Sequence, residues 1–142
     1  MNRLTKGTAA IGALNVQGTV TADNLSTVTA TMTVGTEATN AINVAIQLKD
    51  GNGTDLARRC ALPWYLSSDA NGDAVATAPD GGIAIGTDGL LLEWTANVSG
   101  LVISEADGDI DVTLTESSTG TWYLVLVLPG GNLAVSGAIT FA

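Results

Sequence analysis

Hydrophobic and polar residues alternate one by one along many segments of this chain, and this alternation limits the folds that it can adopt. From Thr27 to Val34, every second residue is apolar and the residues between them are threonines. A period of two residues places the apolar side chains on one face of a β-strand, whereas a helix requires a period of 3.6. No segment has a clear 3.6-residue period. We therefore expect strands throughout, and helices of at most a single turn.

Clusters rich in glycine and aspartate divide the alternating segments at regular intervals. Asp50–Gly53, Asp69–Asp73 and Pro129–Asn132 are three of them. Such residues adopt positive φ angles or hydrogen-bond to their own backbone, as chain reversals require. Short strands at this spacing predict an all-β fold, either an antiparallel β-sandwich or a small β-barrel. We predict strands over residues 27–34, 41–49, 59–66, 74–78, 83–85, 90–97, 101–104, 110–116, 121–128 and 133–141.

The pattern within the strands predicts which side chains form the core. In residues 43–49 the even-numbered positions are aliphatic, which indicates one buried face and one face in water. Residues 122–128 are almost continuously apolar, as in a central strand covered on both sides or in a strand whose exposed face is an interface. Of the three tryptophans, Trp64, Trp94 and Trp122, we expect at least one in the core.

A length of 142 residues suits one domain. The first 26 residues differ from the rest, because they carry glycine, threonine and single aliphatic residues but too few large side chains to build a core. We predict an extended N-terminal arm at residues 1–26, which becomes ordered when it docks on another protein or a neighbouring subunit, and a β-sandwich domain at residues 27–142. The alternative is a first strand of the same domain with a frayed terminus.

The net charge of −9 is unevenly distributed, since residues 60–142 contain ten acidic residues and no basic one. Nucleic-acid affinity depends on lysine and arginine, so we expect no nucleic-acid binding, and the same argument disfavours anionic membranes. No run of 18 apolar residues offers a membrane span, and the start of the chain lacks a signal peptide. We expect a chain that is made and folded in the cytoplasm, with the single cysteine, Cys60, as a small buried side chain.

Catalytic motifs are missing from the sequence. The chain has no histidine to activate a serine, and its glycine-rich stretches lack the Gly-Lys-Ser/Thr ending of a phosphate-binding loop. Its carboxylates have little of the aromatic lining typical of a sugar cleft. We therefore predict a protein that is not an enzyme and that has no catalytic or cofactor-binding residues and no cofactor.

One group of acidic residues resembles the start of a calcium-binding loop. Asp107, Asp109 and Asp111 have the D-x-D-x-D spacing, and the turn at residues 50–55 is also rich in oxygen ligands. An EF-hand loop requires glycine at its sixth position, where this chain has Val112, and Asp109 and Asp111 fall on the outward face of a predicted strand. We expect solvated carboxylates here and no metal site, with calcium binding as the alternative.

Four segments together, residues 43–53, 62–69, 120–131 and 135–140, carry a family resemblance. Their motifs are a strand followed by an Asp-Gly turn, a Trp-Tyr-Leu-Ser-Ser-Asp stretch, and a Thr-Trp-Tyr strand followed by a terminal Ser-Gly-Ala-Ile-Thr strand. They resemble the small immunoglobulin-like structural proteins of tailed bacteriophages, which are often head decoration or cement proteins. The resemblance covers about residues 40–142.

The resemblance implies an immunoglobulin-like β-sandwich that decorates the exterior of a bacteriophage capsid. Such a protein stabilises the shell by binding the outer surface of the major capsid protein lattice, commonly as a homo-oligomer, with a trimer favoured. We expect the arm to dock on the lattice and two arginines beside Cys60 to make a second contact, unless they simply flank a strand. The expected partner-binding residues are Arg3, Lys6, Ile11, Leu14, Val16, Arg58 and Arg59.

Two other functions remain possible for such a sequence. The first is a tail or fibre-associated adhesion module that binds a receptor or carbohydrate through loops such as residues 69–73 and 79–88. The second is a hydrolase that uses the loop carboxylates. A fold alone does not decide between them.

Overall fold

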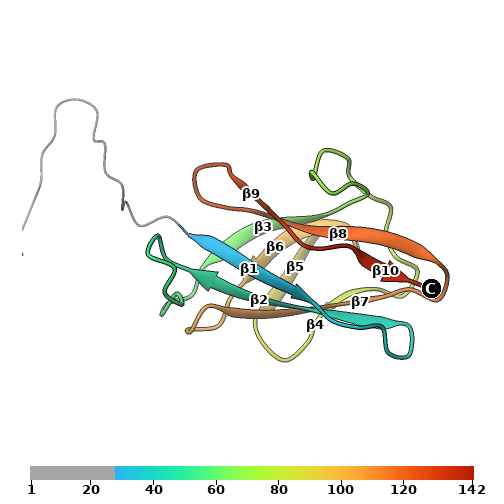
Figure 1. Cartoon of the computed structure of the whole chain (residues 1–142), viewed down its shortest axis with the longest axis horizontal. Helices are drawn as coiled ribbons and strands as arrows, with labels where there is room; N and C mark the ends of the chain where they lie inside the picture. Colours follow the sequence, from blue (N-terminus) through green and yellow to red (C-terminus); the bar gives the residue numbers. More distant parts are fainter. Residues whose placement is uncertain (1–27) are drawn as a thin grey trace, which may run out of the picture.

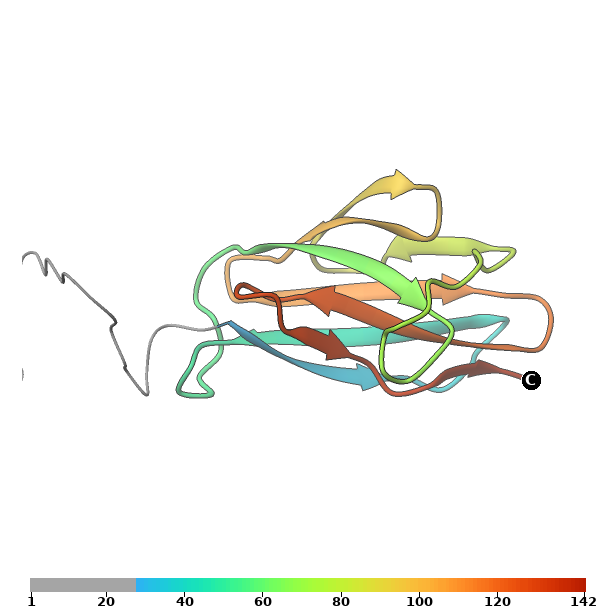
Figure 2. The same cartoon turned by 90° about the horizontal axis from the view of Figure 1, so that it is seen from above.

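The alternating segments form strands, and the strands form two antiparallel sheets that pack together as a sandwich (Figures 1 and 2). The computed structural model describes residues 28–142, and no helix occurs in this part. The predicted arm at residues 1–26 lies outside the described residues. The strands are β1 Thr29–Val34, β2 Ala41–Lys49, β3 Ala61–Ser67, β4 Gly82–Ile85, β5 Leu90–Thr95, β6 Ser99–Ile103, β7 Asp109–Thr115, β8 Gly120–Val127, β9 Leu133–Val135 and β10 Ile139–Phe141.

The order of the strands confirms the predicted antiparallel β-sandwich. The first sheet has the order β1-β2-β7-β4, which corresponds to strands A, B, E and D of an immunoglobulin constant-type domain. In the second sheet β3 and β8 are neighbours, and β9 and β10 follow each other along the free side of β8, as strands C, F and G do. The hairpin β5–β6 widens this sheet beyond β3. In the sequence this hairpin follows β4, which belongs to the four-stranded sheet.

The core fills the space between the two sheets. In β2 and β7 every second residue is buried, and β3 and β8 contribute the facing side chains. Two of the three tryptophans, Trp64 and Trp122, lie in this core, whereas Trp94 on β5 is 66% exposed. The indole NH of Trp64 has no hydrogen-bond partner among the described residues. Leaving it unpaired costs about 1–3 kcal/mol, whereas burying 150–250 Å² of indole at about 25 cal/mol per Å² contributes roughly 4–6 kcal/mol, so burial is favourable.

The predicted strand at residues 74–78 does not form. Within it, only Val75 makes a single β-bridge, to Ser67 at the end of β3. Two backbone hydrogen bonds, from Ser68 to Ala74 (2.9 Å) and from Ala76 to Leu66 (2.8 Å), flank this bridge, and the chain then crosses from β3 in one sheet to β4 in the other. The side chain of Trp122 also holds the crossing segment, because its Nε1 donates a 2.9 Å hydrogen bond to the carbonyl of Thr77.

The predicted strand at residues 133–141 is divided into β9 and β10. Both pair with β8, but one extra residue lies between them, so that Val135 pairs with Val125 while Ile139 pairs with Trp122. A one-residue shift exchanges the faces of a strand. As a result, the inward positions change from the even-numbered Ser136 to the odd-numbered Ile139 and Phe141. Without this bulge, the last strand would turn its large side chains away from the core.

A second bulge lies in β5, where the register to β6 shifts between Glu93 and Thr95. At this point the backbone of β5 comes so close to β6 that a Cβ atom on Gly100 would lie 1.8 Å from the carbonyl oxygen of Leu92. Glycine is therefore required at position 100 because the neighbouring main chain occupies the space of a side chain.

We expect Gly100→Ala to lower the free energy of unfolding by at least about 2 kcal/mol, because the added methyl group forces β5 away from β6. The matched control is Gly137→Ala, whose Cβ would lie 3.7 Å from its nearest neighbour, a methyl group of Val34. This control should change the stability by less than about 1 kcal/mol. Urea unfolding measures both, and equal effects of the two variants would contradict the tight crossing at Gly100.

Candidate protein-binding surface

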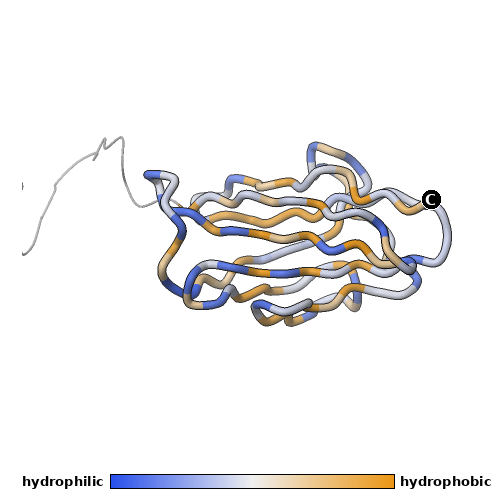
Figure 3. The backbone as a smooth tube through the Cα atoms, turned by 60° about the horizontal axis from the view of Figure 1, so that its bottom comes forward, coloured by the Kyte–Doolittle hydropathy of each residue, from blue (hydrophilic) through white to orange (hydrophobic). Residues whose placement is uncertain are grey.

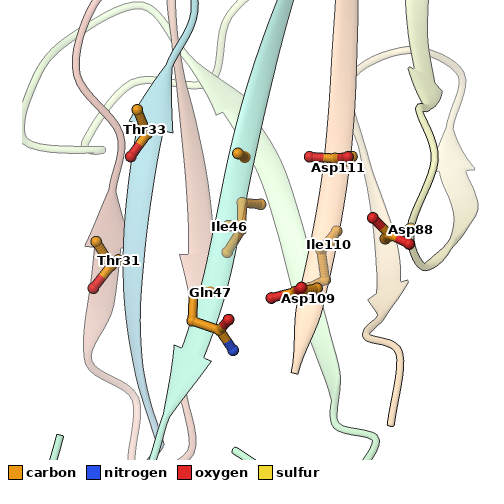
Figure 4. Close-up of a pocket in the computed structure, with 9 residues that line it drawn as sticks. Thr31, Thr33, Ile46, Gln47, Asp88, Asp109, Ile110 and Asp111 are labelled. Carbon is orange, nitrogen blue, oxygen red and sulfur yellow. The ribbon is translucent and has the colours of Figure 1, made fainter. Parts of the chain in front are cut away.

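The outer face of the four-stranded sheet is polar. Its outward residues, which alternate with the core residues of β1, β2 and β7, are mainly threonine, amide and carboxylate side chains, and Figure 3 shows hydrophilic and hydrophobic residues alternating along the strands. Figure 4 shows side chains of β1, β2 and β7 next to one another around a shallow hollow of about 280 Å³ on this face. We call this surface the acidic face, because Asp109 and Asp111 outnumber its single base, Lys49: Thr29, Thr31, Thr33, Ala41, Asn43, Ala45, Gln47, Lys49, Asp109, Asp111, Thr113 and Thr115.

The outer face of the six-stranded sheet carries an apolar patch over β5, β6, β3, β8 and β9, and register places the polar Ser99, Thr121 and Thr140 on the same side of the sheet. Cross-strand register places Leu92 opposite Leu101, which in turn lies opposite Pro63. On the other side of β3, Tyr65 lies opposite Val125, and Val125 opposite Val135. Residues opposite one another in a ladder share a face. We call this surface the apolar face: Leu90, Leu92, Leu101, Ile103, Ala61, Pro63, Tyr65, Val125, Val127, Leu133 and Val135.

Several large side chains of the apolar face are open to solvent. Leu90 is 48% exposed, Leu92 46% and Leu133 43%, and these residues lie on the two flanking strands β5 and β9. The central positions are half-buried by their neighbours, apart from Val125, which is fully buried. Single exposed leucines are ordinary, but a group of apolar side chains exposed on neighbouring strands is typical of a binding site.

The sequence prediction found one strand of this surface and missed the others. The continuous apolar run at residues 122–128 indicated either a strand covered on both sides or an interface. The structure confirms the first feature at Val125, which is fully buried on the side opposite to Leu124 and Leu126 in the core, and it places the half-buried Val127 on the apolar face. The use of this face as an interface stays a prediction. A similar run, Leu90-Leu91-Leu92, carried the same signal in β5.

Charged residues border the apolar face at its two ends. At one end Arg59 and Glu105 form an ion pair, with an Nη2–Oε2 distance of 2.6 Å. Toward the other end the loop at Gly72 covers part of the face: Gly72 lies against Tyr65, Leu133 and the fully buried Val125, and its carbonyl accepts a 2.7 Å hydrogen bond from the Tyr65 hydroxyl. Burial raises the pKa of Tyr65, and the carboxylates at positions 73 and 69 add to this effect.

The structure describes only two of the predicted partner-binding residues. Arg59 lies at the edge of the apolar face, and the exposed Arg58 lies beside it before β3. The segment between β2 and β3 lies at the end of the body where β1 begins, because the first residue of β1 pairs with the last of β2 (Figure 1). Arg3, Lys6, Ile11, Leu14 and Val16 lie outside the described residues.

Cys60 is half-buried and packs against the core, so it is less enclosed than predicted. Burial raises the pKa of its thiol, although the charge of Arg58 acts in the opposite direction. A raised pKa keeps the thiol protonated and unreactive at neutral pH. This supports a packing role for the side chain.

The carboxylates of the calcium-like motif lie on the surface of the four-stranded sheet and do not converge on one point. Asp109 and Asp111 are on the acidic face, as predicted, and Asp111 accepts hydrogen bonds from Asn43 and Thr87. Across residues 28–142, no three metal-binding side chains come close enough together to hold an ion, and no helix is able to cross a membrane. Burial raises the pKa of Asp109, as do the neighbouring carboxylates, first among them Asp107.

The carboxylates of Asp80 and Glu116 form hydrogen bonds that hold the loop before β4 against the end of β7. The backbone NH of Asp80 donates a 2.9 Å hydrogen bond to the buried Glu116, and the Asp80 carboxylate accepts hydrogen bonds from the hydroxyl and backbone NH of Ser117. The Ser117 hydroxyl and backbone bonds lower the pKa of Asp80, and the hydroxyl of Ser118 does the same, together with backbone bonds, for Glu116. These carboxylates hold the loop in place.

The opposite pKa shifts of Asp80 and Asp109 predict opposite effects of substitution by asparagine. A lowered pKa stabilises the folded protein at neutral pH, and this contribution is lost as the pH falls through the folded-state pKa, below about 4. Asp80→Asn should therefore destabilise the protein at pH 7. A raised pKa opposes folding at neutral pH, so Asp109→Asn should stabilise it.

Thermal unfolding of both variants between pH 7 and pH 3 measures these effects. Each difference from the wild type should shrink as the pH falls and the carboxylate of the wild-type protein becomes protonated. If the two variants shift the melting temperature in the same direction at pH 7, the assigned environment of one carboxylate is wrong.

Comparison with known proteins identifies no relative of this chain. The chain matches no protein-family model, no curated protein and no solved structure.

Proposed function

We propose that this chain is a non-enzymatic structural protein of a virus particle, which decorates and stabilises a bacteriophage capsid by binding the outer surface of the major capsid protein lattice. The observation that carries this proposal is the contrast between the two outer faces of the sandwich. One face carries a patch of apolar side chains from five strands, and the opposite face consists mainly of threonine, amide and carboxylate side chains. A domain with one apolar and one polar outer face is suited to a layer that contacts protein on one side and water on the other.

The sequence resemblance to phage virion proteins supports the same function. In this proposal the apolar face lies against protein within the assembled shell, and the acidic face is turned outward on the capsid exterior. The arm, with Arg3, Lys6, Ile11, Leu14 and Val16, extends onto the lattice, and Arg58 and Arg59 lie at the end of the body from which it departs. Many copies act together, so each contact needs only modest affinity.

One observation favours the alternative of a tail or fibre-associated adhesion module. Trp94 is 66% exposed on the edge strand β5. Exposed aromatic rings combine an apolar surface with a polar NH group and are common at binding interfaces. In this alternative the indole is part of a receptor- or carbohydrate-binding site.

Quantitative mass spectrometry of purified particles tests the proposal and separates it from the alternative. A decoration protein should be present at about one copy per major capsid subunit, or at a simple fraction of that number, because it repeats with the lattice. A handful of copies per particle would assign the chain to the tail or a fibre. Absence from the particle would refute both virion functions.

Deletion of residues 1–26 tests the arm in a capsid co-sedimentation assay. We expect a folded body that no longer binds capsids. Reversal of the two arm charges, in Arg3→Glu with Lys6→Glu, should weaken binding by at least about tenfold at low salt, and less at 0.5 M salt, because the screening length is already about 8 Å at 0.15 M. Circular dichroism provides the control for folding, and binding that withstands the deletion would exclude the arm as the attachment site.

A further inference from the structure

We propose that the free edge of β5 binds an extended segment of another protein, which adds to the six-stranded sheet as a further antiparallel strand. The segment carries a lysine or arginine two residues before a large aliphatic residue. This inference rests on the proposed function, in which the segment belongs to the major capsid protein, and it names how that partner is held. The site is the edge of the sheet and not its outer face.

Two residues of β5 direct their backbone groups away from the sheet. Among the described strands, β5 pairs only with β6. The NH of Ser104 donates a 3.0 Å hydrogen bond to the carbonyl of Cys60, which shows that β6 uses its even-numbered residues to bond to β3. Its odd-numbered residues therefore bond to the even-numbered residues of β5. Leu91 and Glu93 consequently present their NH and C=O groups to an added strand.

The other sheet edges within residues 28–142 are short or partly covered. On β4 the NH of Ile83 already donates a 3.1 Å hydrogen bond to the side chain of Asn97. Beside β1 lies the C-terminal segment, and the NH of Ala142 donates a 3.0 Å hydrogen bond to Glu37. β9 and β10 have three residues each. β5 has neither the lysine nor the proline that commonly protects an edge strand, and its bulge disturbs the ladder only beyond Glu93.

A hollow between the two sheets lies beside this edge. β4 and β5 are on the same side of the sandwich (Figure 2), and a hollow of about 270 Å³ opens between them. Ile83 and Ile85 of β4 line it, together with Leu91 of β5, which packs against the core. Residues opposite each other in a ladder share a face. A partner residue opposite Leu91 therefore points into the hollow, whose apolar walls suit a large aliphatic side chain.

The charge beside the hollow favours a basic partner residue. The exposed Glu93 lies two residues after Leu91 and lines the same hollow. Its carboxylate accepts a 2.6 Å hydrogen bond from the backbone NH of Asn97, which holds it at this place. In an antiparallel strand, the residue opposite Glu93 comes two positions before the residue opposite Leu91. A lysine or arginine at that position pairs with the carboxylate across the ladder.

The sequence of this chain contains no segment of this kind. Two residues after its five basic residues stand Thr5, Thr8, Gly51, Cys60 and Ala61, none of which is a large aliphatic residue. Its own arm and a second copy therefore lack the combination of charge and side chain that the edge selects. The occupant is a segment of a different protein.

Titration of the ¹⁵N-labelled full chain with the peptide acetyl-Thr-Lys-Thr-Ile-Thr-Ser-amide, followed by NMR, tests the inference. We expect saturable shifts of the amide signals of Leu91 and Glu93 with a Kd of about 1 mM, since the ordering of a short flexible peptide offsets most of the gain. A peptide N-methylated at its isoleucine cannot donate to the carbonyl of Leu91 and should bind at least about tenfold more weakly. Glutamate in place of the peptide's lysine should also weaken binding, by about fivefold.

A pair of matched protein variants tests the charge. Glu93→Gln keeps an oxygen for the bond from Asn97 and should raise the Kd of the lysine peptide about threefold, whereas Glu37→Gln, exposed beyond β1, should change it by less than about twofold. A peptide that causes no shift up to about 5 mM overturns the inference, and so does binding that N-methylation leaves unchanged. Both outcomes are distinct from failure of the proposed function, which is decided by the presence of the chain in purified particles.

Discussion

Packing between the inner faces of the two sheets is the interaction on which the rest of the structure depends. Leu48 and Leu114 from one sheet and Trp64 and Leu126 from the other are 0–1% exposed. Each such side chain contributes about 1.5–3 kcal/mol or more when it is buried. Because side chains alternate along a strand, this contribution is lost if a strand slips by one residue. The core therefore fixes the register of the central strands, and through the register it also fixes which residues face outward.

The bulges in β5 and before β10 follow from the same constraint. At the end of the chain, one extra residue turns Ile139 and Phe141 inward, so the last strand closes the core even though its sequence pattern changes phase. In β5, the close crossing at Gly100 keeps the edge strand against β6. The first bulge completes the core, and the second lies at the edge of the apolar face. Local irregularities of the ladder thus serve both packing and the shape of the surface.

Residue pattern predicted much of the fold because short-range geometry determines it. The bounds of β2 agree with the predicted strand, and the turn clusters fall between strands, since positive φ and side-chain-to-backbone hydrogen bonds are local properties. The segment at residues 74–78 was mispredicted because its composition suits a strand, but its position requires a crossover between sheets. The apolar face was only partly foreseen, from residues 122–128. Its other members lie on strands that are far apart in the sequence. An apolar residue in a strand also does not show by itself which of the two faces of the sheet it occupies.

The sequence by itself determined that this chain forms strands, that its second half is acidic, and that it carries no histidine for acid–base catalysis. These properties depend on residue type and on spacing over a few positions. Only the tertiary structure decided that an apolar patch gathers on one outer face, and that two carboxylates and a series of threonines gather on the other. The physical reason is that strand pairing joins residues far apart in the chain, such as Leu92, Pro63 and Val135, and the choice of partners depends on the packing of the whole sandwich.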